Sequence, residues 1–334
     1  MTTYYGLYGQ KVQYLASDPT DPQTGQVWYN STSATLKVSG FVATGTWASG
    51  GNVNTQQSYG SGAGALQTAS IKFGGATNAP GGFNTAASET YNGTSWTSIS
   101  SINTPRLAAG GSGTTSAALM WGGGSTPTGY HGTSTEKYDG SSWTTSGALP
   151  VSTNYCKGFG TQTATVFAGG DNGAPTGTYS FNGSTWTTLP ATLPSPRNNC
   201  VAWGTSTAGL ISNGGAPGLS PTSTLTSLSW NGSTWTSAPS TNNDRSYGAC
   251  FGTQTAAIAS CGNTTGSPTD AVELYNGSSW STQTSNPTTS GPTGAGGGTN
   301  AAGVQWAGNN PGGMLSNTTE WSGPGPAIQT VTVS

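Results

Sequence analysis

Short apolar runs alternate with polar turns along most of the chain, and one six-residue pattern recurs among them. Residues 91–96 read YNGTSW, and related stretches begin at residues 138, 181, 230 and 275, which gives intervals of 47, 43, 49 and 45 residues. Asn-Gly or Asp-Gly between two aromatic-bearing runs favours a type I′ turn, because Asn, Asp and Gly tolerate the positive φ angles that this turn needs. Each copy therefore predicts a β-hairpin of two antiparallel strands.

A second pattern precedes each hairpin. It consists of a strand-like stretch, an apolar run and a pair of glycines, as in SIKFGG and ALMWGG. Four clear copies end at Gly75, Gly123, Gly170 and Gly215, and two weaker copies end at Asn263 and Asn309. Two strands thus precede the glycines and two follow them, which is the content of one propeller blade. Six copies at this period predict an all-β, six-bladed β-propeller.

The sixth hairpin is split between the two ends of the chain. Trp321 lies in its first strand, and Trp47, which stands 49 residues before Trp96, lies in its second. An open ring would leave two exposed sheet edges, and such edges favour aggregation. We therefore expect the two strands to pair and to close a propeller that spans residues 41–323, followed by a C-terminal tail of residues 324–334.

Repeated aromatic side chains supply most of the material for a core. They are Tyr91, Trp96, Tyr138, Trp143, Trp186, Trp235, Tyr275 and Trp280, together with Trp47 and Trp321. Such large amphipathic rings are suited to fill the wedge between neighbouring blades, and a sugar-binding platform is the alternative interpretation. The repeated Asn-Gly-Ser/Thr triplets match a glycosylation sequence, but the turn alone explains them.

These features resemble the kelch repeat family, which builds β-propellers. The resemblance rests on the apolar run, the double glycine, the tyrosine, the tryptophan and a Pro-Arg pair before the next blade, present at residues 105–106 and 196–197. The spacing from tyrosine to tryptophan is shorter than in kelch repeats. Because propellers serve as enzymes, adhesins and scaffolds, the resemblance implies a fold and no single activity.

Residues 1–40 are predicted to form a separate attachment segment. Within the stretch GQVWYNSTSATLKV, a Ser/Thr/Asn turn separates two short runs, which predicts a hairpin. The apolar residues of these runs are Val27, Trp28, Tyr29, Leu36 and Val38. A single hairpin has too little apolar area to fold alone, so this segment should dock on another surface.

The attachment segment resembles short stretches in structural proteins of tailed bacteriophages, fibres among them. Only 5% of the residues are charged, Gly, Ser, Thr and Asn are abundant, and the beginning of the chain has no apolar stretch of signal-peptide length. A phage protein made in the host cytoplasm and released by lysis would have these properties. The expected function is a virion structural protein, as a tail fibre, an adhesin or a capsid decoration.

This interpretation implies particular partners. We expect other virion proteins to bind residues 1–40 and a host-surface glycan to bind the propeller, and self-association into a homo-oligomer stays open. A net charge of −2 without a basic run argues against nucleic acid as a partner. No segment has the run of apolar residues that insertion into a membrane requires.

Candidate chemistry is sparse. His131 is the single histidine, so neither a copper site nor a Ser-His-Asp triad can be assembled. The four cysteines lack zinc-binding spacing and are expected to be free, buried thiols, with a disulfide between Cys250 and Cys261 as the alternative. We therefore predict no catalytic residue, no metal site and no cofactor.

Three glutamates, Glu89, Glu136 and Glu273, stand two residues before a repeated aromatic. A glycoside hydrolase needs two carboxylates across a sugar. The repetition of these glutamates instead favours hydrogen bonds between blades. Their candidate partners are Arg106, Arg197 and Arg245.

Ligand-binding residues of a propeller concentrate in the loops of one face. The connections after the double glycines are long and dissimilar, and they contain Phe83, Tyr130, His131 and Asp171, which are suited to hold a glycan by stacking and hydrogen bonding. A cellular glycan-binding lectin or a scaffold propeller is the alternative function. A polysaccharide hydrolase ranks last.

Overall fold

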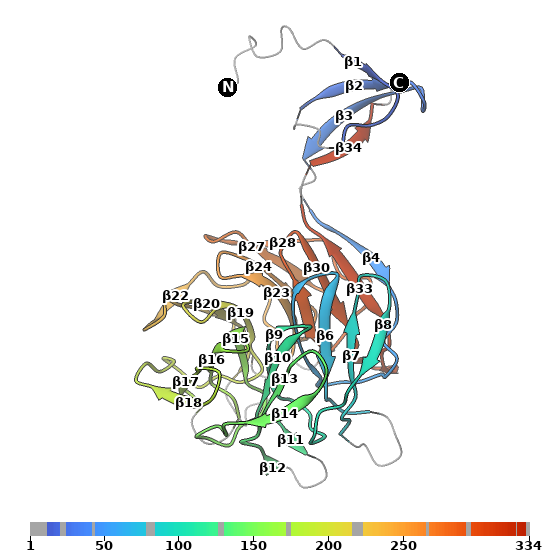
Figure 1. Ribbon diagram of the computed structural model, residues 1–334. Helices are drawn as coiled ribbons and strands as arrows, with labels where there is room; N and C mark the ends of the chain where they lie inside the picture. Colours follow the sequence, from blue (N-terminus) through green and yellow to red (C-terminus); the bar gives the residue numbers. More distant parts are fainter. Residues whose placement is uncertain are drawn as a thin grey trace. The chain divides into compact units, whose positions relative to one another are not determined.

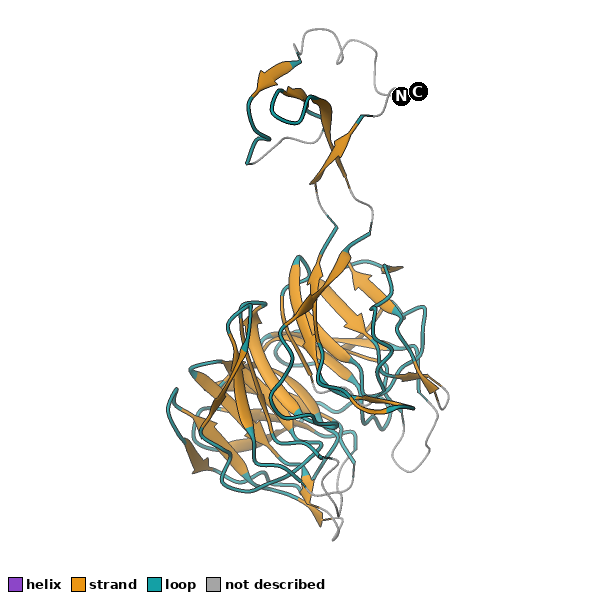
Figure 2. Ribbon diagram, turned by 90° about the vertical axis from the view of Figure 1, so that its right-hand side faces the viewer, coloured by secondary structure: helices purple, strands orange, loops and turns teal. Residues whose placement is uncertain are grey.

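The described residues of the computed structural model form strands and turns, and they include no helix (Figure 2). These residues are 12–20, 25–41, 44–77, 84–125, 130–171, 175–215, 223–264, 267–291, 295–324 and 326–331. Accordingly, this part of the chain holds no helix that could cross a membrane. The chain divides into a smaller unit of residues 1–46 with 323–334 and a larger unit of residues 47–322. The predicted all-β class is confirmed.

Six four-stranded sheets make up the larger unit in its described residues, and we number them in chain order (Figure 1). Sheet 1 contains β5 (Ser61–Leu66), β6 (Ala69–Phe73), β7 (Ser88–Tyr91) and β8 (Trp96–Ile99); sheet 2 contains β9 (Gly110–Thr114), β10 (Ala117–Trp121), β13 (Thr135–Tyr138) and β14 (Trp143–Ser146); sheet 3 contains β15 (Lys157–Thr161), β16 (Ala164–Ala168), β17 (Thr178–Phe181) and β18 (Trp186–Leu189). Sheet 4 contains β19 (Val201–Thr205), β20 (Ala208–Ser212), β21 (Ser227–Trp230) and β22 (Trp235–Ala238); sheet 5 contains β23 (Ala249–Thr253), β24 (Ala256–Ser260), β27 (Val272–Tyr275) and β28 (Trp280–Thr282); sheet 6 contains β29 (Ala295–Gly298), β30 (Ala302–Trp306), β33 (Thr318–Ser322) and β4 (Thr46–Gly50).

Three short strand pairs extend the connections that follow the second strands of sheets 2, 5 and 6. They are β11 (Gly124–Ser125) with β12 (Tyr130–His131), β25 (Asn263–Thr264) with β26 (Ser267–Pro268), and β31 (Asn309–Asn310) with β32 (Gly313–Met314).

The first strands of the six sheets are neighbours in a closed cycle, since β5 contacts both β9 and β29. Main-chain hydrogen bonds join the sheets in the same order. In each sheet, the amide of a glycine that closely follows the second strand donates to a carbonyl that precedes the first strand of the next sheet. These bonds run from Gly75 to Arg106 (2.9 Å), Gly123 to Thr153 (2.9 Å), Gly170 to Arg197 (2.8 Å), Gly214 to Arg245 (2.9 Å), Gly262 to Ser290 (2.8 Å) and Gly308 to Gln57 (2.9 Å). The last bond returns from sheet 6 to sheet 1. The arrangement is consistent with a β-propeller.

One glycine of the sequence repeat was assigned one residue too late. Gly214, with φ +75°, donates the inter-sheet bond that Gly75 donates in sheet 1, whereas Gly215 forms a β-bridge with Asn198. The left-handed position before it is occupied by Asn213, with φ +59°. Asn tolerates this conformation better than most residues do, so the glycine pair of sheet 4 is an Asn-Gly pair followed by an additional glycine.

Strands from the two ends of the chain lie side by side in sheet 6. β4 is the neighbour of β33, and the ring centroids of Trp47 and Trp321 are 5.1 Å apart. The amide of Val53 donates to the carbonyl of Ser316 at 2.8 Å. The sheet therefore depends on contacts between residues more than 250 positions apart in sequence.

The repeated aromatic side chains pack between neighbouring sheets. Tyr91, Trp96, Tyr138, Trp143, Trp186, Tyr275, Trp280 and Trp321 are buried, and Trp47 and Trp235 are half-buried. Several of the indoles also donate a hydrogen bond to a hydroxyl on the preceding sheet, as Trp96 does to Thr318 (2.8 Å) and Trp186 to Thr135 (2.9 Å). Each such tryptophan thus contributes apolar area and one polar contact across the wedge.

The smaller unit is a sheet of four strands in its described part: β1 (Gln13–Leu15), β2 (Val27–Asn30), β3 (Thr35–Phe41) and β34 (Pro326–Thr330). β2 and β3 pair antiparallel as a hairpin, and β3 pairs with β34 on its other side. Residues 326–330 are therefore a strand of this unit, whereas the sequence analysis treated residues 324–334 as a tail. A long-range pairing of this kind has no local sequence signal.

Asp18 organises the hairpin of the smaller unit. Its Oδ1 atom accepts hydrogen bonds from the amide of Asn30 (2.7 Å) and the indole of Trp28 (2.9 Å), and Trp28 is completely buried. The Oδ1 atom of Asn30 in turn accepts the amides of Thr32 and Ser33, each at 3.0 Å. The bonds from Asn30 and Trp28 hold the pKa of the Asp18 carboxyl below its ordinary value.

We expect Asp18→Asn to loosen the smaller unit at neutral pH, because a carboxylate accepts hydrogen bonds more strongly than a neutral amide. Hydrogen exchange measured on peptides from residues 25–41 should be faster in the variant.

Since the folded-state pKa of Asp18 lies below that of the unfolded chain, the contribution of this carboxylate to stability is present at neutral pH and is lost as the pH falls through the folded-state pKa. The matched control is Asp139→Asn. The four other hairpins of the repeat have Asn at this position, and its side chain accepts the same loop amide. Equal exchange in Asp18→Asn and the unaltered chain would contradict the assigned role.

The register of sheet 4 predicts unequal effects at two adjacent glycines. Gly214→Ala should lower the free energy of unfolding by about 2 kcal/mol or more, since a Cβ there requires a left-handed conformation and collides with the Asn198 carbonyl. Gly215→Ala should change it by less than about 1 kcal/mol. Urea denaturation of both variants measures the difference, and a larger loss for Gly215→Ala would reverse the assignment.

Candidate functional site

The two ends of the larger unit differ in their connections. The glycine pairs follow the second strands at one end, which we call the loop end, and the long connections begin there. The turns between third and fourth strands, such as the one closed by Tyr91 and Trp96, lie at the opposite end, which we call the hairpin end. The predicted type I′ turn is wrong, because four residues separate the paired Tyr91 and Trp96 and Asn92 has no positive φ; its side chain instead accepts two amides of the loop. β33 finishes and β4 begins at the hairpin end, because Val53, after β4, bonds to Ser316, before β33. The chain therefore enters and leaves the larger unit at the end opposite to the long connections.

Of the four residues predicted to hold a ligand, only Asp171 has a described side chain. Phe83 lies outside the described residues, and Tyr130 and His131 are described only as the backbone of β12, which pairs with β11. The Asp171 amide donates to the carbonyl of Asn154 at 2.8 Å, directly after the glycine pair of sheet 3.

Three tyrosines that the sequence analysis missed meet on the axis of the larger unit at the loop end. Tyr59, Tyr155 and Tyr247 precede the first strands of sheets 1, 3 and 5, and their ring centroids lie 5.5 to 6.0 Å apart with edge-on geometry. We call these residues the axial tyrosines. Burial raises the pKa of all three hydroxyls, that of Tyr155 to about 12, so they stay neutral and act as hydrogen-bonding groups.

The backbone positions of the axial tyrosines belong to a repeated feature. The equivalent residues in sheets 1 to 5 all have a left-handed conformation and are Tyr59 (φ +52°), Ala108 (+56°), Tyr155 (+52°), Asn199 (+54°) and Tyr247 (+61°). From Ala108 onward, each amide in this series donates to the carbonyl of the preceding member at 2.8 to 3.0 Å. Large and small side chains alternate, which leaves room for three rings on one axis. This alternation is the sequence signal that could have revealed them.

Below the axial tyrosines, the first strands enclose a cavity of about 130 Å³. Its lining consists largely of glycines, with Lys157 as the charged residue of that lining. The glycines allow the strands to approach closely, since a Cβ on Gly111 would stand 2.6 Å from the carbonyl oxygen of Gly62 in sheet 1. The cavity is thus a narrow space lined mainly by the polar backbone of the first strands.

The three repeated glutamates are buried in ion pairs within sheets 1, 2 and 5. Lys72 contacts Glu89 at 2.8 Å, Arg106 contacts Glu136 at 3.1 Å, and Arg245 contacts Glu273 at 2.5 Å. Each carboxylate also accepts two backbone amides of the connection that arrives from the preceding sheet. These glutamates fasten consecutive sheets, and none of them has a free oxygen that faces solvent.

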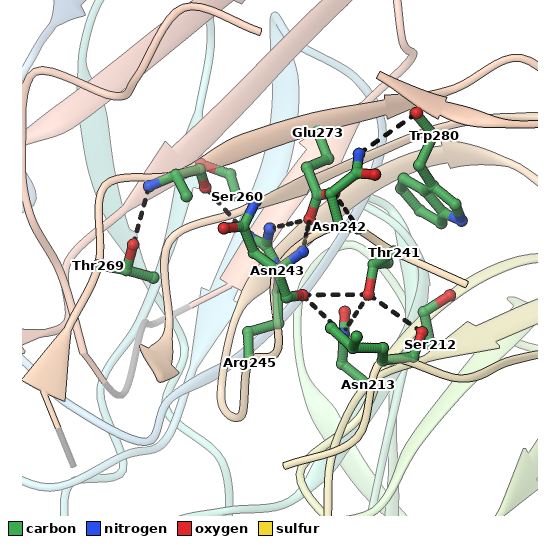
Figure 3. A network of polar contacts seen from close by, with 12 residues as sticks. Ser212, Asn213, Thr241, Asn242, Asn243, Arg245, Ser260, Thr269, Glu273 and Trp280 are labelled. Carbon is green, nitrogen blue, oxygen red and sulfur yellow. Dashed lines mark hydrogen bonds and ion pairs between the residues drawn. The ribbon is translucent and has the colours of Figure 1, made fainter. Parts of the chain in front are cut away.

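Figure 3 shows this arrangement in sheet 5. Glu273 accepts the amide of Asn242 at 2.6 Å and faces Arg245, whose second terminal nitrogen donates to the carbonyls of Cys261 and Ala271. Beside them, Asn213 of sheet 4 donates from its side-chain amide to the Thr241 hydroxyl at 2.7 Å. The same asparagine that fits the left-handed position thus also holds the connection to the next sheet.

Arg197 has no glutamate partner, because Leu228 occupies the corresponding position in sheet 4. Its guanidinium instead donates to the Thr226 carbonyl (2.9 Å) and the Thr226 hydroxyl (2.6 Å). The predicted partnership between the arginines and the glutamates therefore occurs for two of the three arginines, and Lys72 takes the equivalent place in sheet 1.

All four cysteines are free thiols, and no disulfide joins Cys250 to Cys261. Burial raises the pKa of Cys156 to about 12 and that of Cys200 to about 11, so neither is a reactive thiolate at neutral pH. Within the part of the chain that the structure describes, no three His, Cys, Asp or Glu side chains are grouped to hold a metal ion.

Comparison with solved structures supports a propeller-like fold. The chain is similar to a solved structure titled "Structure of YjhT", with a TM-score of 0.66 and 13% sequence identity, over 84% of this chain and 99% of that one. No family model matches the chain, and no curated protein matches it. At this identity the similarity concerns the fold alone.

The buried ion pair of sheet 5 predicts a large effect of a small substitution. Glu273→Gln should lower the free energy of unfolding by about 3 kcal/mol, because it leaves the Arg245 charge buried without a counter-charge. Glu320→Gln is the control, since Glu320 accepts a hydrogen bond from the neutral hydroxyl of Tyr91 and should lose less than about 1 kcal/mol. Equal losses in urea denaturation would contradict a special role for the pair.

Proposed function

We propose that the larger unit is a six-bladed, kelch-like β-propeller and that the protein is a structural component of a tailed-phage virion. Six four-stranded sheets, a closed cycle of first strands and the completion of sheet 6 by β4 support the propeller assignment. The repeated glycine pairs and inter-sheet tryptophans are the features that resemble kelch repeats.

The smaller unit is the part that attaches the protein to the particle, and its limited core is the observation that carries this proposal. Trp28 is its one fully buried large apolar side chain among the described residues. Val12 and Tyr14 are 53% and 74% exposed, and the Tyr14 ring stacks on Tyr29 at 5.1 Å. A sheet with so little core gains stability when another protein covers such groups.

The loop end of the larger unit is the part that faces the host surface. β4 begins and β33 ends at the hairpin end, so the chain enters and leaves the larger unit at the end opposite to the loop end. The axial tyrosines offer aromatic edges and neutral hydroxyls there, and the charge of Asp171 acts on Tyr155 and Tyr247, adding to the rise of their pKa that burial causes. Aromatic rings with adjacent polar groups are suited to bind a glycan by stacking and hydrogen bonding.

Incorporation into particles tests the attachment proposal. In the full-length chain, Trp28→Ala should abolish incorporation, measured by mass spectrometry of purified virions, while the thermal unfolding of the larger unit stays unchanged. Trp235→Ala, which alters an inter-sheet contact of the larger unit, should lower its stability and spare incorporation at permissive temperature. Normal incorporation of Trp28→Ala would contradict the proposal.

A cellular glycan-binding lectin is the second candidate, and the axial tyrosines favour it. Glycan binding on an array, lost in Tyr59→Ala with Tyr247→Ala, would support recognition by either kind of protein. Absence of the chain from purified particles would then favour the cellular lectin. A polysaccharide hydrolase ranks below both, because the three repeated glutamates are engaged in buried ion pairs.

A further inference from the structure

The axial cavity contains a charge that breaks the repeat. Lys157 is the first residue of β15 and lines both the cavity and the small space beneath the axial tyrosines. The corresponding first residues of the other first strands are Ser61, Gly110, Val201, Ala249 and Ala295. Five of the six sheets therefore have a small or apolar residue at this position, and sheet 3 has a lysine.

The Lys157 ammonium also differs from the other buried or half-buried cations. Lys72, Arg106 and Arg245 each meet a glutamate, and Lys137 donates to the carbonyl of Gly183 at 3.0 Å. The Lys157 ammonium has no hydrogen bond or ion pair to any described residue. Lys157 is half-buried, and an ammonium that loses part of its water is costly unless a polar partner solvates it.

The position of this charge is on the axis, close to several sheets. Burial raises the pKa of the Cys250 thiol in sheet 5, and the Lys157 charge acts against that rise. The same charge acts on Cys200, which precedes sheet 4. Lys157 thus lies at the axis, where it lines the cavity together with residues of sheets 4 and 5.

The cavity walls supply further donors. Each first strand pairs within its sheet only with the second strand, so the edge that faces the axis has amide and carbonyl groups outside any ladder. Gly158, Gly160 and Gly204 line the cavity without side chains that would cover this backbone. Backbone amides that converge on a concave space bind anions.

We propose that the axial cavity is a binding site for one small anion, a halide or an oxyanion no larger than phosphate. The Lys157 ammonium and backbone amides of the first strands hold the anion, and the volume of about 130 Å³ accommodates an ion of this size. The axial tyrosines close the loop end, so the anion enters from the hairpin end. The bound anion neutralises a charge that the repeat itself leaves without a counter-ion.

Bromide provides a direct test with the unaltered protein. Crystals grown or soaked in sodium bromide should show an anomalous peak on the axis within hydrogen-bonding distance of Lys157 Nζ. The same experiment with Lys157→Met should remove this peak and leave surface bromide sites in place. Bromide at surface sites alone in the unaltered protein would overturn the proposal.

Solution stability separates specific binding from a general salt effect. At constant ionic strength, replacement of gluconate, which is larger than the proposed ligands, by chloride or phosphate should raise the melting temperature of the unaltered protein. The rise should be lost in Lys157→Met and retained in the matched control Lys137→Met. An equal rise in both variants would overturn the proposal.

Discussion

The fold of the larger unit depends on closure of its ring of sheets through backbone hydrogen bonds. Six amide-to-carbonyl bonds of 2.8 to 2.9 Å link each sheet to the next and return from Gly308 to Gln57. The donors follow residues in left-handed conformations, which is why Gly, Asn and a few other residues occupy those positions. Because every sheet is fastened on both sides, loss of one link weakens two neighbours, and the unit should unfold as one cooperative body.

Polar contacts carry an unusual share of this architecture. Only 32% of the residues are hydrophobic, and many Ser, Thr and Asn side chains are buried between sheets. Indole-to-hydroxyl bonds and the three glutamate ion pairs satisfy these groups in specific pairs. Such contacts are directional, so they select the order of the sheets, whereas the stacked aromatic rings supply most of the apolar burial.

The period of the repeat and its Asn-Gly turns were sufficient to predict the strands and the four-stranded sheets, because both signals are local. Gly215 was confused with Gly214 because Asn213 replaces a glycine and shifts the visible pair by one residue. The axial tyrosines were missed because Tyr recurs only in alternate sheets, with Ala108 and Asn199 between them, so the signal has twice the period of the strands. Lys157 was not predicted as a site residue, because a single lysine in a repeat has no sequence signal. That its ammonium has no partner among the described residues is visible only in three dimensions.

The pairing of β3 with β34 makes the larger unit an insertion between two adjacent strands of the smaller one. The propeller-like body is therefore tethered by two covalent connections rather than one. A protease that cuts a single connection leaves the other intact, and the hydrogen bonds between β3 and β34 still hold the severed end. Mechanical load on the body is likewise divided between two strands of the smaller unit.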